Sequence, residues 1–281
     1  MLQVEGKVSA LVKRASPVSM VNATITASLK AVSLVYGGSV HALGPVDLDL
    51  QNGEFFSIIG PSGCGKSTLL DVVAGLKPPT EGTVTFEGQL VTKVPEGVGI
   101  VFQDDASFPW LKVWDNIAFG LRRAGIPHDE IHRRVDYAVA FMGLKDFARA
   151  YPAELSGGMR QRVCIARTLV LQPRMILLDE PFGALDQQTR LLMGDELLRL
   201  WRETKATVLL ITHSLDEAAM LSDRIGVMSA RPGRFIEIID TEWASDRDSR
   251  IATDARFSDI TRHLWEKLRG ESIKAMGGRQ P

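Results

Sequence analysis

The sequence predicts an α/β fold: a mostly parallel core sheet, an antiparallel β region and an inserted α-helical subdomain. Short apolar runs at Phe55–Ile59, Met175–Leu178 and Thr207–Ile211 are typical of strands buried on both faces. Segments with helical spacing alternate with these runs, as in sheets whose parallel strands are joined by helices. Residues 27–36 and 45–50 instead alternate apolar and polar side chains, which indicates strands with one solvated face.

The composition favours one domain with tails. The chain has 281 residues, of which 45% are hydrophobic and 24% are charged. Its formal net charge is −1, which offers no bulk attraction to nucleic acid, so we expect no nucleic-acid partner. No run approaches the roughly 20 apolar residues that cross a bilayer. The positions of Cys64 and Cys164 suggest neither a disulfide framework nor a metal site.

The N-terminal half contains clear turn and stop signals. Tyr36–Gly38 is typical of a turn. The strand Phe55–Ile59 leads into a glycine-rich loop, and a helix is predicted at Lys66–Ala74, where Gly75 and a Pro-Pro pair end it. Further strands are predicted at Val84–Phe86 and Val98–Phe102.

The middle of the chain is predicted to be mainly helical. Residues 113–150 carry helical spacing, and the Gly125–Pro127 step separates two helices. Ser156 begins another helix, which ends near Val170. We therefore expect a helical subdomain at about residues 104–172.

The last third returns to alternating helices and strands. The predicted elements are a helix near Thr189–Thr204, a strand at Thr207–Ile211, a helix at Leu215–Leu221 and a strand at Ile225–Ser229. From about Asp254, apolar residues at helical spacing predict an amphipathic helix that caps the domain. We expect residues 1–26 to be a flexible extension and residues 241–281 to be a C-terminal helical extension.

A glycine-rich loop supplies the first chemical signal. Its residues are Gly60, Pro61, Ser62, Gly63, Cys64, Gly65, Lys66, Ser67 and Thr68. They fit the phosphate-binding pattern G-x-x-x-x-G-K-[ST], with a strand before the loop and a helix after it. The glycines allow backbone N–H groups to converge on phosphates. Lys66 is placed to reach the outer phosphates, and the Ser67 hydroxyl to ligate Mg²⁺. The loop predicts nucleotide binding, and together with the two acids described next it indicates a P-loop NTPase.

Two acids follow the apolar strand Met175–Leu178. Asp179 is placed to hold Mg²⁺, directly or through water, and Glu180 to polarise an attacking water. Taken alone, the pattern is equally consistent with an ordinary strand that ends in acids.

A second candidate anion site lies at Leu155–Arg162. Ser156 is a good helix N-cap, and Gly157 and Gly158 leave backbone N–H groups open to approach. The alternative interpretation is a capped helix that follows a flexible loop.

The motifs together resemble the ATP-binding cassette (ABC) proteins over about residues 27–240. Leu155–Arg162 resembles the signature motif of that family, just upstream of Asp179 and Glu180. Other matches in family order are Tyr36 for the aromatic residue that stacks on adenine, Gln103 for the Q-loop glutamine, Ala184-Leu185-Asp186 for the D-loop and His213 for the switch histidine. Tyr36 could also be ordinary packing, and His213 a solvated loop residue.

The resemblance implies a site shared by two copies of the chain. Cassettes of this family pair head to tail, so each ATP would lie between Gly60–Thr68 of one copy and Ser156–Gly158 of the other. Glu180 would act as general base and His213 would contact the γ-phosphate. Asp186 would communicate across the dimer. The metal ligands implied by the resemblance are Ser67, Gln103 and Asp179, with Gln103 also linking the site to the transport partner.

A narrower resemblance concerns import ATPases. The segment Phe108–Trp114 suggests an exposed apolar groove, which in ABC transporters receives a short helix of the membrane subunit; a tryptophan-rich core is the alternative. Residues 102–121 and Arg231–Arg234 are similar to the nitrate/sulfonate/taurine importers. This similarity implies a separate integral membrane permease, an extracytoplasmic substrate-binding protein and a peripheral location on the cytoplasmic face of the cell membrane.

Two other functions remain open at this point. One is an ABC ATPase that serves a membrane-linked task other than import. The other is a soluble P-loop ATPase without a transport role. The transported solute is not encoded in any motif of this chain.

Overall fold

A computed structural model describes residues 25–103, 106–183 and 185–275. Residues 1–24 of the predicted extension lie outside the described residues, as do residues 104–105 and Ala184 of the D-loop segment. Ile25 and Thr26, assigned above to the extension, begin strand β1 instead. The described residues form two compact units, one made of 25–106 with 173–275 and the other of 107–172.

The first unit contains a six-stranded sheet within the described residues, in the order β10-β9-β3-β8-β7-β6. Its strands are β3 (Phe55–Ile59), β6 (Val98–Val101), β7 (Met175–Asp179), β8 (Thr207–Ile211), β9 (Arg224–Met228) and β10 (Phe235–Asp240). All neighbours pair in parallel except β10, which is antiparallel to β9. The predicted mostly parallel core sheet is confirmed, and its carboxyl ends carry the loops described below.

A second, antiparallel sheet belongs to the same unit, in the order β2-β1-β4-β5. Its strands are β1 (Ile25–Tyr36), β2 (Val40–Gln51), β4 (Glu81–Phe86) and β5 (Gln89–Leu90). The turn predicted at Tyr36–Gly38 joins β1 to β2, with both glycines at positive φ. The predicted antiparallel region is therefore present.

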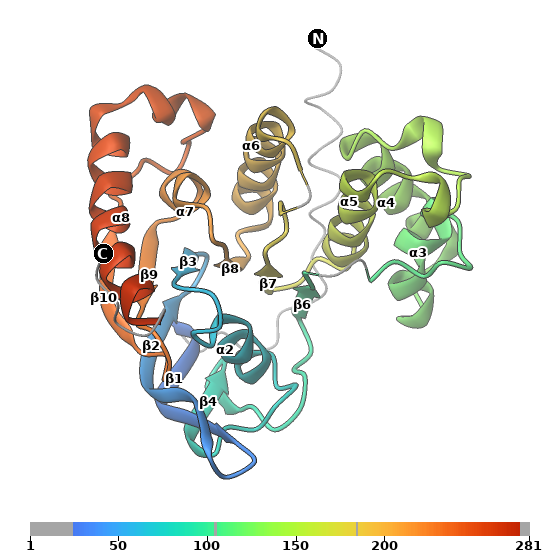
Figure 1. Cartoon of the computed structure of the whole chain (residues 1–281). Coiled ribbons are helices and arrows are strands. Elements are labelled where there is room, and N and C mark those ends of the chain that lie inside the picture. The colour runs from blue at the N-terminus through green and yellow to red at the C-terminus, as the bar shows by residue number, and fades with distance from the viewer. Residues whose placement is uncertain (1–24, 104–105, 184, 276–281) are drawn as a thin grey trace. The chain divides into compact units, whose positions relative to one another are not determined.

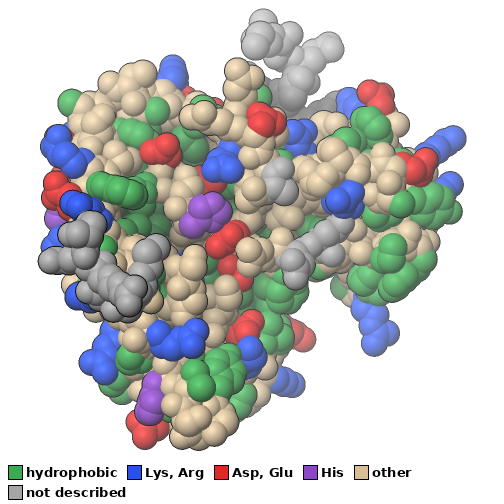
Figure 2. Space-filling view, viewed as in Figure 1, with side chains coloured by type: hydrophobic (Ala, Val, Ile, Leu, Met, Phe, Trp, Pro, Cys, Tyr) green, Lys and Arg blue, Asp and Glu red, His purple; other side chains and the backbone are tan. Residues whose placement is uncertain are grey.

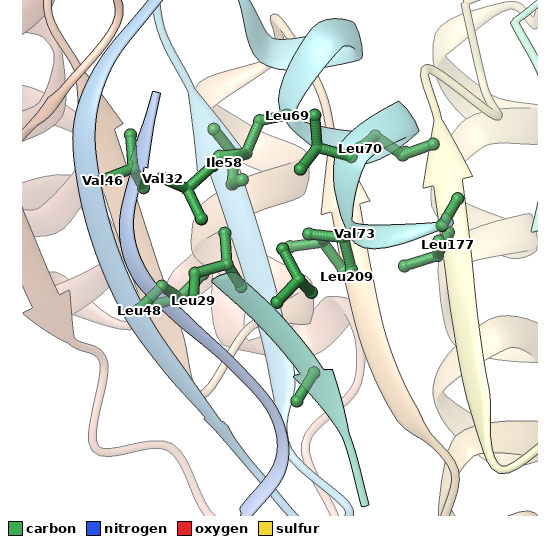
Figure 3. Close-up of a cluster of buried hydrophobic side chains, with 14 of the residues drawn as sticks. Leu29, Val32, Val46, Leu48, Ile58, Leu69, Leu70, Val73, Leu177 and Leu209 are labelled. Atoms are coloured by element: carbon green, nitrogen blue, oxygen red, sulfur yellow. The ribbon is translucent and has the colours of Figure 1, made fainter. Parts of the chain in front are cut away.

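Helix α2 (Lys66–Val73) packs into the main core of this unit. Its residues Leu69, Leu70 and Val73 are buried among side chains of both sheets (Figure 3). The partners drawn there include Leu29 of β1 and Ile58 of β3. This burial anchors the start of α2, and with it the glycine-rich loop that precedes the helix.

Three further helices and one short 3₁₀ segment complete the described part of this unit. They are α6 (Gln187–Thr204), α7 (Leu215–Leu221), η4 (Ser249–Thr253) and α8 (Ala255–Ala275). Helix α8 runs beside α7 and β9, as Figure 1 shows, and buries Leu264 against Ala218 and Ile225. The apolar stripe predicted from Asp254 onward thus forms a helix that packs on the sheet.

The second unit is helical throughout its regular elements. They are α3 (Val113–Arg123), α4 (His128–Phe141), η2 (Lys145–Phe147), η3 (Pro152–Glu154) and α5 (Gly157–Leu169). Helix α3 packs on both α4 and α5. Buried Asn116 secures the segment before α3, because its side-chain amide donates to the carbonyls of Phe108 and Leu111.

Basic and acidic side chains are interspersed on the face shown in Figure 2. Among the described helices, none combines the length and apolar character that a bilayer-spanning helix requires.

Candidate functional site

The glycine-rich loop connects the carboxyl end of β3 to the N-terminus of α2. Gly65 caps the helix in a left-handed conformation with φ 112°. A Cβ atom at this position would lie 2.8 Å from the Ala42 carbonyl oxygen, so only glycine fits. Gly63 also has positive φ, at 72°. The loop therefore places backbone N–H groups at a helix N-terminus, an arrangement that favours anions.

Lys66 folds back over this loop. Its Nζ donates to the carbonyls of Gly60 at 2.9 Å and Pro61 at 3.0 Å, and the side chain is buried. Cys64 is also buried in the loop, and burial raises the pKa of its thiol. The Lys66 ammonium is thus held at the loop, where an incoming phosphate would provide further acceptors.

Asp179 ends β7 and lies next to the loop. Burial raises the pKa of its carboxyl, and a hydrogen bond with Ser67 opposes that rise. Its Oδ1 is buried and has no hydrogen-bond partner among the described residues. A buried carboxylate oxygen with an open position beside a hydroxyl is a donor set that suits a hard cation such as Mg²⁺.

Glu180 joins two other predicted residues at the carboxyl ends of the strands. Its Oε2 accepts a hydrogen bond from the side-chain amide of Gln103 at 3.1 Å. The same oxygen lies 3.2 Å from Nδ1 of His213. These residues follow β7, β6 and β8, which are neighbours in the sheet. The fold therefore gathers residues that lie up to 110 positions apart in sequence, from 103 to 213.

The Glu180 backbone adopts an unusual conformation. Its φ is +47°, a left-handed value that non-glycine residues rarely adopt. The backbone N–H still donates to the Ile211 carbonyl at 2.9 Å, so the ladder between β7 and β8 extends through this residue. Such a backbone costs about 1–3 kcal/mol and is commonest at functional sites.

Sequence reasoning missed two residues, Glu217 and Arg190, that are linked to Thr212, the residue before His213. The buried Glu217 accepts from the Thr212 hydroxyl at 2.5 Å, and its other oxygen lies 3.2 Å from Nε of Arg190. Arg190 also donates to the Leu185 carbonyl at 3.1 Å. This chain of contacts connects the loop before His213 to the loop before α6. The spacing Ser214-x-x-Glu217, a capping-box pattern, was the available signal in the sequence.

Tyr36 lies near the far end of the glycine-rich loop. Its hydroxyl is 3.3 Å from that of Thr68, and this hydrogen bond lowers the pKa of Tyr36. Lys77 donates to the same hydroxyl at 3.1 Å. The Tyr36 side chain is 38% exposed, and the Lys77 ammonium lies over its ring, 5.4 Å from the ring centre.

The remaining predicted residues cap helices. Asp186 is the N-cap of α6 and accepts from the backbone N–H of Thr189 at 3.0 Å. In the helical unit, Ser156 is the N-cap of α5 and accepts from the N–H of Met159 at 3.3 Å. Gly157 and Gly158 form the first turn of α5, and none of the three residues from 156 to 158 is fully buried.

An aromatic cluster in the helical unit, formed by Phe108, Trp110 and Phe119, is partly exposed. The ring of Phe108 lies 5.6 Å from that of Trp110 and 4.7 Å from that of Phe119. Trp110 is 71% exposed and Phe119 45% exposed. The alternative of a tryptophan-rich core is therefore wrong for Trp110. Arg167 lies over the Phe108 ring, with its guanidinium carbon 4.8 Å from the ring centre.

Comparisons with known proteins find import ATP-binding proteins and solved ATP-binding cassettes. The taurine import ATP-binding protein of Jannaschia sp. is 48% identical over 81% of this chain and 87% of its own length. The nitrate import ATP-binding protein of Synechocystis sp. is 41% identical over 84% of this chain and 91% of its own. A solved dimeric ATP-binding cassette with bound ADP and phosphate is 32% identical, with TM-score 0.70, over 78% of this chain and all of its own.

The family model described as ABC transporter matches residues 43–183, which include the glycine-rich loop, Ser156–Gly158 and Glu180. This match, the relatives' coverage and the fold agree with one another. The chain belongs to the ABC transporter family and is an ATP-hydrolysing ABC ATPase.

Proposed function

We propose that this chain is the ATPase subunit of an ABC importer. It couples ATP binding and hydrolysis to uptake of a small solute of the nitrate, sulfonate or taurine type through a separate permease. The observation that carries the ATPase role is the Glu180 carboxylate, adjacent to Asp179 and within 3.2 Å of both Gln103 and His213. The importer role is supported by the names of the two importer relatives.

We also propose a division of the chain into domains. Residues 25–240 would form the ATPase domain, which starts with strand β1, with a helical subdomain at about 104–172. Residues 241–281 would form the C-terminal extension, whose helix α8 packs on the sheet. The chain would act at the cytoplasmic face of the cell membrane through its partners.

Within the site, the loop Gly60–Thr68 would hold the ATP phosphates through its backbone N–H groups and Lys66. Ser67, Asp179 and Gln103 would hold Mg²⁺, which when bound neutralises phosphate charge. The buried Oδ1 of Asp179, which has no hydrogen-bond partner within the described part of the chain, supports this assignment. Tyr36 would stack on the adenine through its exposed face.

Glu180 is the residue proposed to take a proton from the attacking water. A general base must lie within hydrogen-bond reach of that water, and Glu180 directly follows Asp179, which is hydrogen bonded to Ser67 of the phosphate-binding loop. Gln103 donates a hydrogen bond to Oε2, and Nδ1 of His213 lies 3.2 Å from the same oxygen, so both side chains would orient this carboxylate. In addition, His213 would contact the γ-phosphate.

A second copy of the chain would complete the site. Ser156 caps α5 by accepting from the N–H of Met159, and the N–H groups of Gly157 and Gly158 precede the first hydrogen bond of the helix ladder. Ser156, Gly157 and Gly158 would therefore bind the ATP held by the other copy, and Asp186 would communicate across the dimer. The dimeric state of the solved relative supports this arrangement.

The permease is proposed to dock on the aromatic cluster Phe108, Trp110 and Phe119. Exposed aromatic residues of this kind commonly anchor protein interfaces. In the sequence, Phe108 follows Gln103 by five positions, and Gln103 contacts Glu180, so the permease contact and the catalytic carboxylate would be linked along the chain.

Purification of the full-length chain with its membrane partners tests this function. We expect an integral permease to co-purify, and the matching binding protein loaded with its solute to stimulate ATP hydrolysis in proteoliposomes. Trp110→Ala should abolish co-purification while the isolated chain still binds ATP, and Leu90→Ala, at another exposed apolar residue, should not. Recovery of a membrane complex without solute uptake would instead favour a membrane-linked task other than import, and recovery of no membrane partner a soluble ATPase.

A further inference from the structure

The loop Ser229–Arg234, which connects β9 to β10, packs directly on the glycine-rich phosphate loop. Gly233 donates its N–H to the Ala42 carbonyl at 3.0 Å and accepts from the N–H of Gly44 at 3.0 Å. A Cβ atom at Gly233 would lie 2.3 Å from the Cys64 carbonyl oxygen. The two backbones are therefore so close that no side chain fits between them.

Arg231 of this loop hydrogen bonds to the phosphate loop. Its Nε and Nη2 donate to the Gly63 carbonyl oxygen at 3.1 Å and 2.9 Å. That carbonyl belongs to the planar peptide unit between Gly63 and Cys64. Gly63 has positive φ and no side chain of its own, so its conformation depends on such external contacts.

Helix α8 also contacts the loop Ser229–Arg234. Glu271 of α8 is buried, and its Oε2 accepts from the backbone N–H of Ala230 at 2.8 Å. Its Oε1 pairs with Lys274 at 2.5 Å. The hydroxyl of Ser229 lies 3.1 Å from the Pro232 carbonyl and accepts from the N–H of Arg234 at 3.1 Å, which makes the loop internally bonded.

These contacts form a continuous path from the C-terminal helix to the phosphate loop. It runs from Glu271 to Ala230, through the adjacent residue Arg231, and on to Gly63. A loop held in its binding conformation before the ligand arrives loses less entropy on binding. The path therefore gives α8 a physical means to affect nucleotide affinity.

We propose that Arg231 and Glu271 are positioning residues for nucleotide binding. Arg231 preorganises the phosphate loop by fixing the Gly63 carbonyl, and Glu271 holds the loop that carries Arg231. The proposal rests on the proposed role of Gly60–Thr68 in binding phosphates. It assigns to the C-terminal helix a function beyond covering the sheet.

The test is calorimetric titration of the full-length chain with ADP and Mg²⁺, together with hydrogen exchange of the phosphate loop without nucleotide. We expect Arg231→Ala to raise the Kd for ADP about three- to tenfold, the effect of losing one typical intramolecular hydrogen bond. Arg231→Lys, which keeps one charged donor, should lie between wild type and Arg231→Ala. Exchange in the loop should accelerate in Arg231→Ala.

Variants of Glu271 test whether its hydrogen bond to Ala230 affects ADP affinity through Arg231 rather than through the overall stability of the protein. Glu271→Gln keeps an oxygen acceptor for the Ala230 N–H and should bind ADP nearly as wild type does, whereas Glu271→Ala should weaken binding. Adding Glu271→Ala to Arg231→Ala should have little further effect, because both changes act through one loop. Arg262→Ala, at an exposed arginine of α8, is the matched control and should change neither measurement.

Wild-type affinity and wild-type exchange in Arg231→Ala would overturn the positioning role. Failure of the wild-type chain to bind ADP would overturn the proposed nucleotide site instead. In that case the exchange measurement alone would still decide whether Arg231 and Glu271 order the loop.

Discussion

The Oε2 atom of Glu180 lies 3.2 Å from Nδ1 of His213. The two residues stand at the ends of adjacent parallel strands, β7 and β8, and the Glu180 N–H bonds to Ile211, two residues before the histidine. The backbone hydrogen bonds between β7 and β8 therefore continue as far as Glu180. Because both strands are wholly buried, their register is strongly specified, and the pair is held by the core rather than by a flexible loop.

Glu180→Gln should abolish most ATP hydrolysis while ATP binding persists. The amide keeps the size of the side chain and can still hydrogen bond to Gln103, but it cannot accept a proton. Loss of a general base typically lowers kcat by about 10²- to 10⁴-fold. Steady-state phosphate release measures the loss, and size-exclusion chromatography with ATP should reveal a trapped dimer.

Glu266→Gln on helix α8 is the matched control for this change, because Glu266 is exposed and far in sequence from the site. Its kcat should equal that of wild type. Hydrolysis at the wild-type rate by Glu180→Gln would show that another group acts as the base.

Lys66→Ala should weaken nucleotide binding strongly. The ammonium is hydrogen bonded to the loop carbonyls of Gly60 and Pro61, so it lies at the phosphate loop. Charge-assisted hydrogen bonds contribute about 1.5–3 kcal/mol, so their loss should weaken ATP binding about tenfold to a hundredfold or more. Calorimetric titration measures the change. Lys145→Ala, at an exposed lysine, should bind normally, and tight binding by Lys66→Ala would contradict the assignment.

Much of the fold could be predicted because its core strands are uniformly apolar. Strands β3 and β8 have the predicted limits, and α7 also begins and ends where expected. Strand β10 was missed because most of its residues are only half-buried, so neither an apolar run nor a clean alternation marks it. Strand β2 starts at Val40 rather than at residue 45, since its first residues do not alternate.

Sequence reasoning predicted less of the site than of the fold. Motifs identified Glu180, Gln103 and His213 separately, but only the strand order shows that they meet. Arg231 is 168 residues from Gly63, and nothing in either segment predicts their hydrogen bonds. Glu217 was missed because a buried acid inside a short helix has the same sequence pattern as an exposed one.

Leu70→Ala should destabilise the first unit strongly. Leu70 is buried in the core between α2 and the sheets (Figure 3). Truncating a buried leucine typically costs about 2–5 kcal/mol, as lost transfer free energy plus the cavity left behind. Urea unfolding measures the change. Leu192→Ala removes the same atoms from an exposed position on α6 and should cost less than about 0.5 kcal/mol.

Glu217 should make the free energy of unfolding fall as pH rises, whereas an acid stabilised by a surface ion pair has the opposite effect. Burial raises the pKa of its carboxyl above the ordinary 4.5, although Thr212 and Arg190 oppose the rise. Above pH 4.5 the native state therefore keeps a proton that the unfolded chain releases, and the free energy of unfolding falls as pH increases. The fall should end once pH exceeds the raised folded-state pKa.

Comparison with Glu217→Gln isolates this contribution, because glutamine does not titrate. Urea unfolding of both proteins from pH 4.5 upward should show the wild type losing stability relative to the variant over the window that starts at 4.5. Asp216→Asn, which alters the neighbouring and more exposed acid on α7, should not change the pH dependence in this direction. A constant difference between wild type and Glu217→Gln would mean that Arg190 and Thr212 fully compensate for burial, so that the carboxylate is held ionised behind His213.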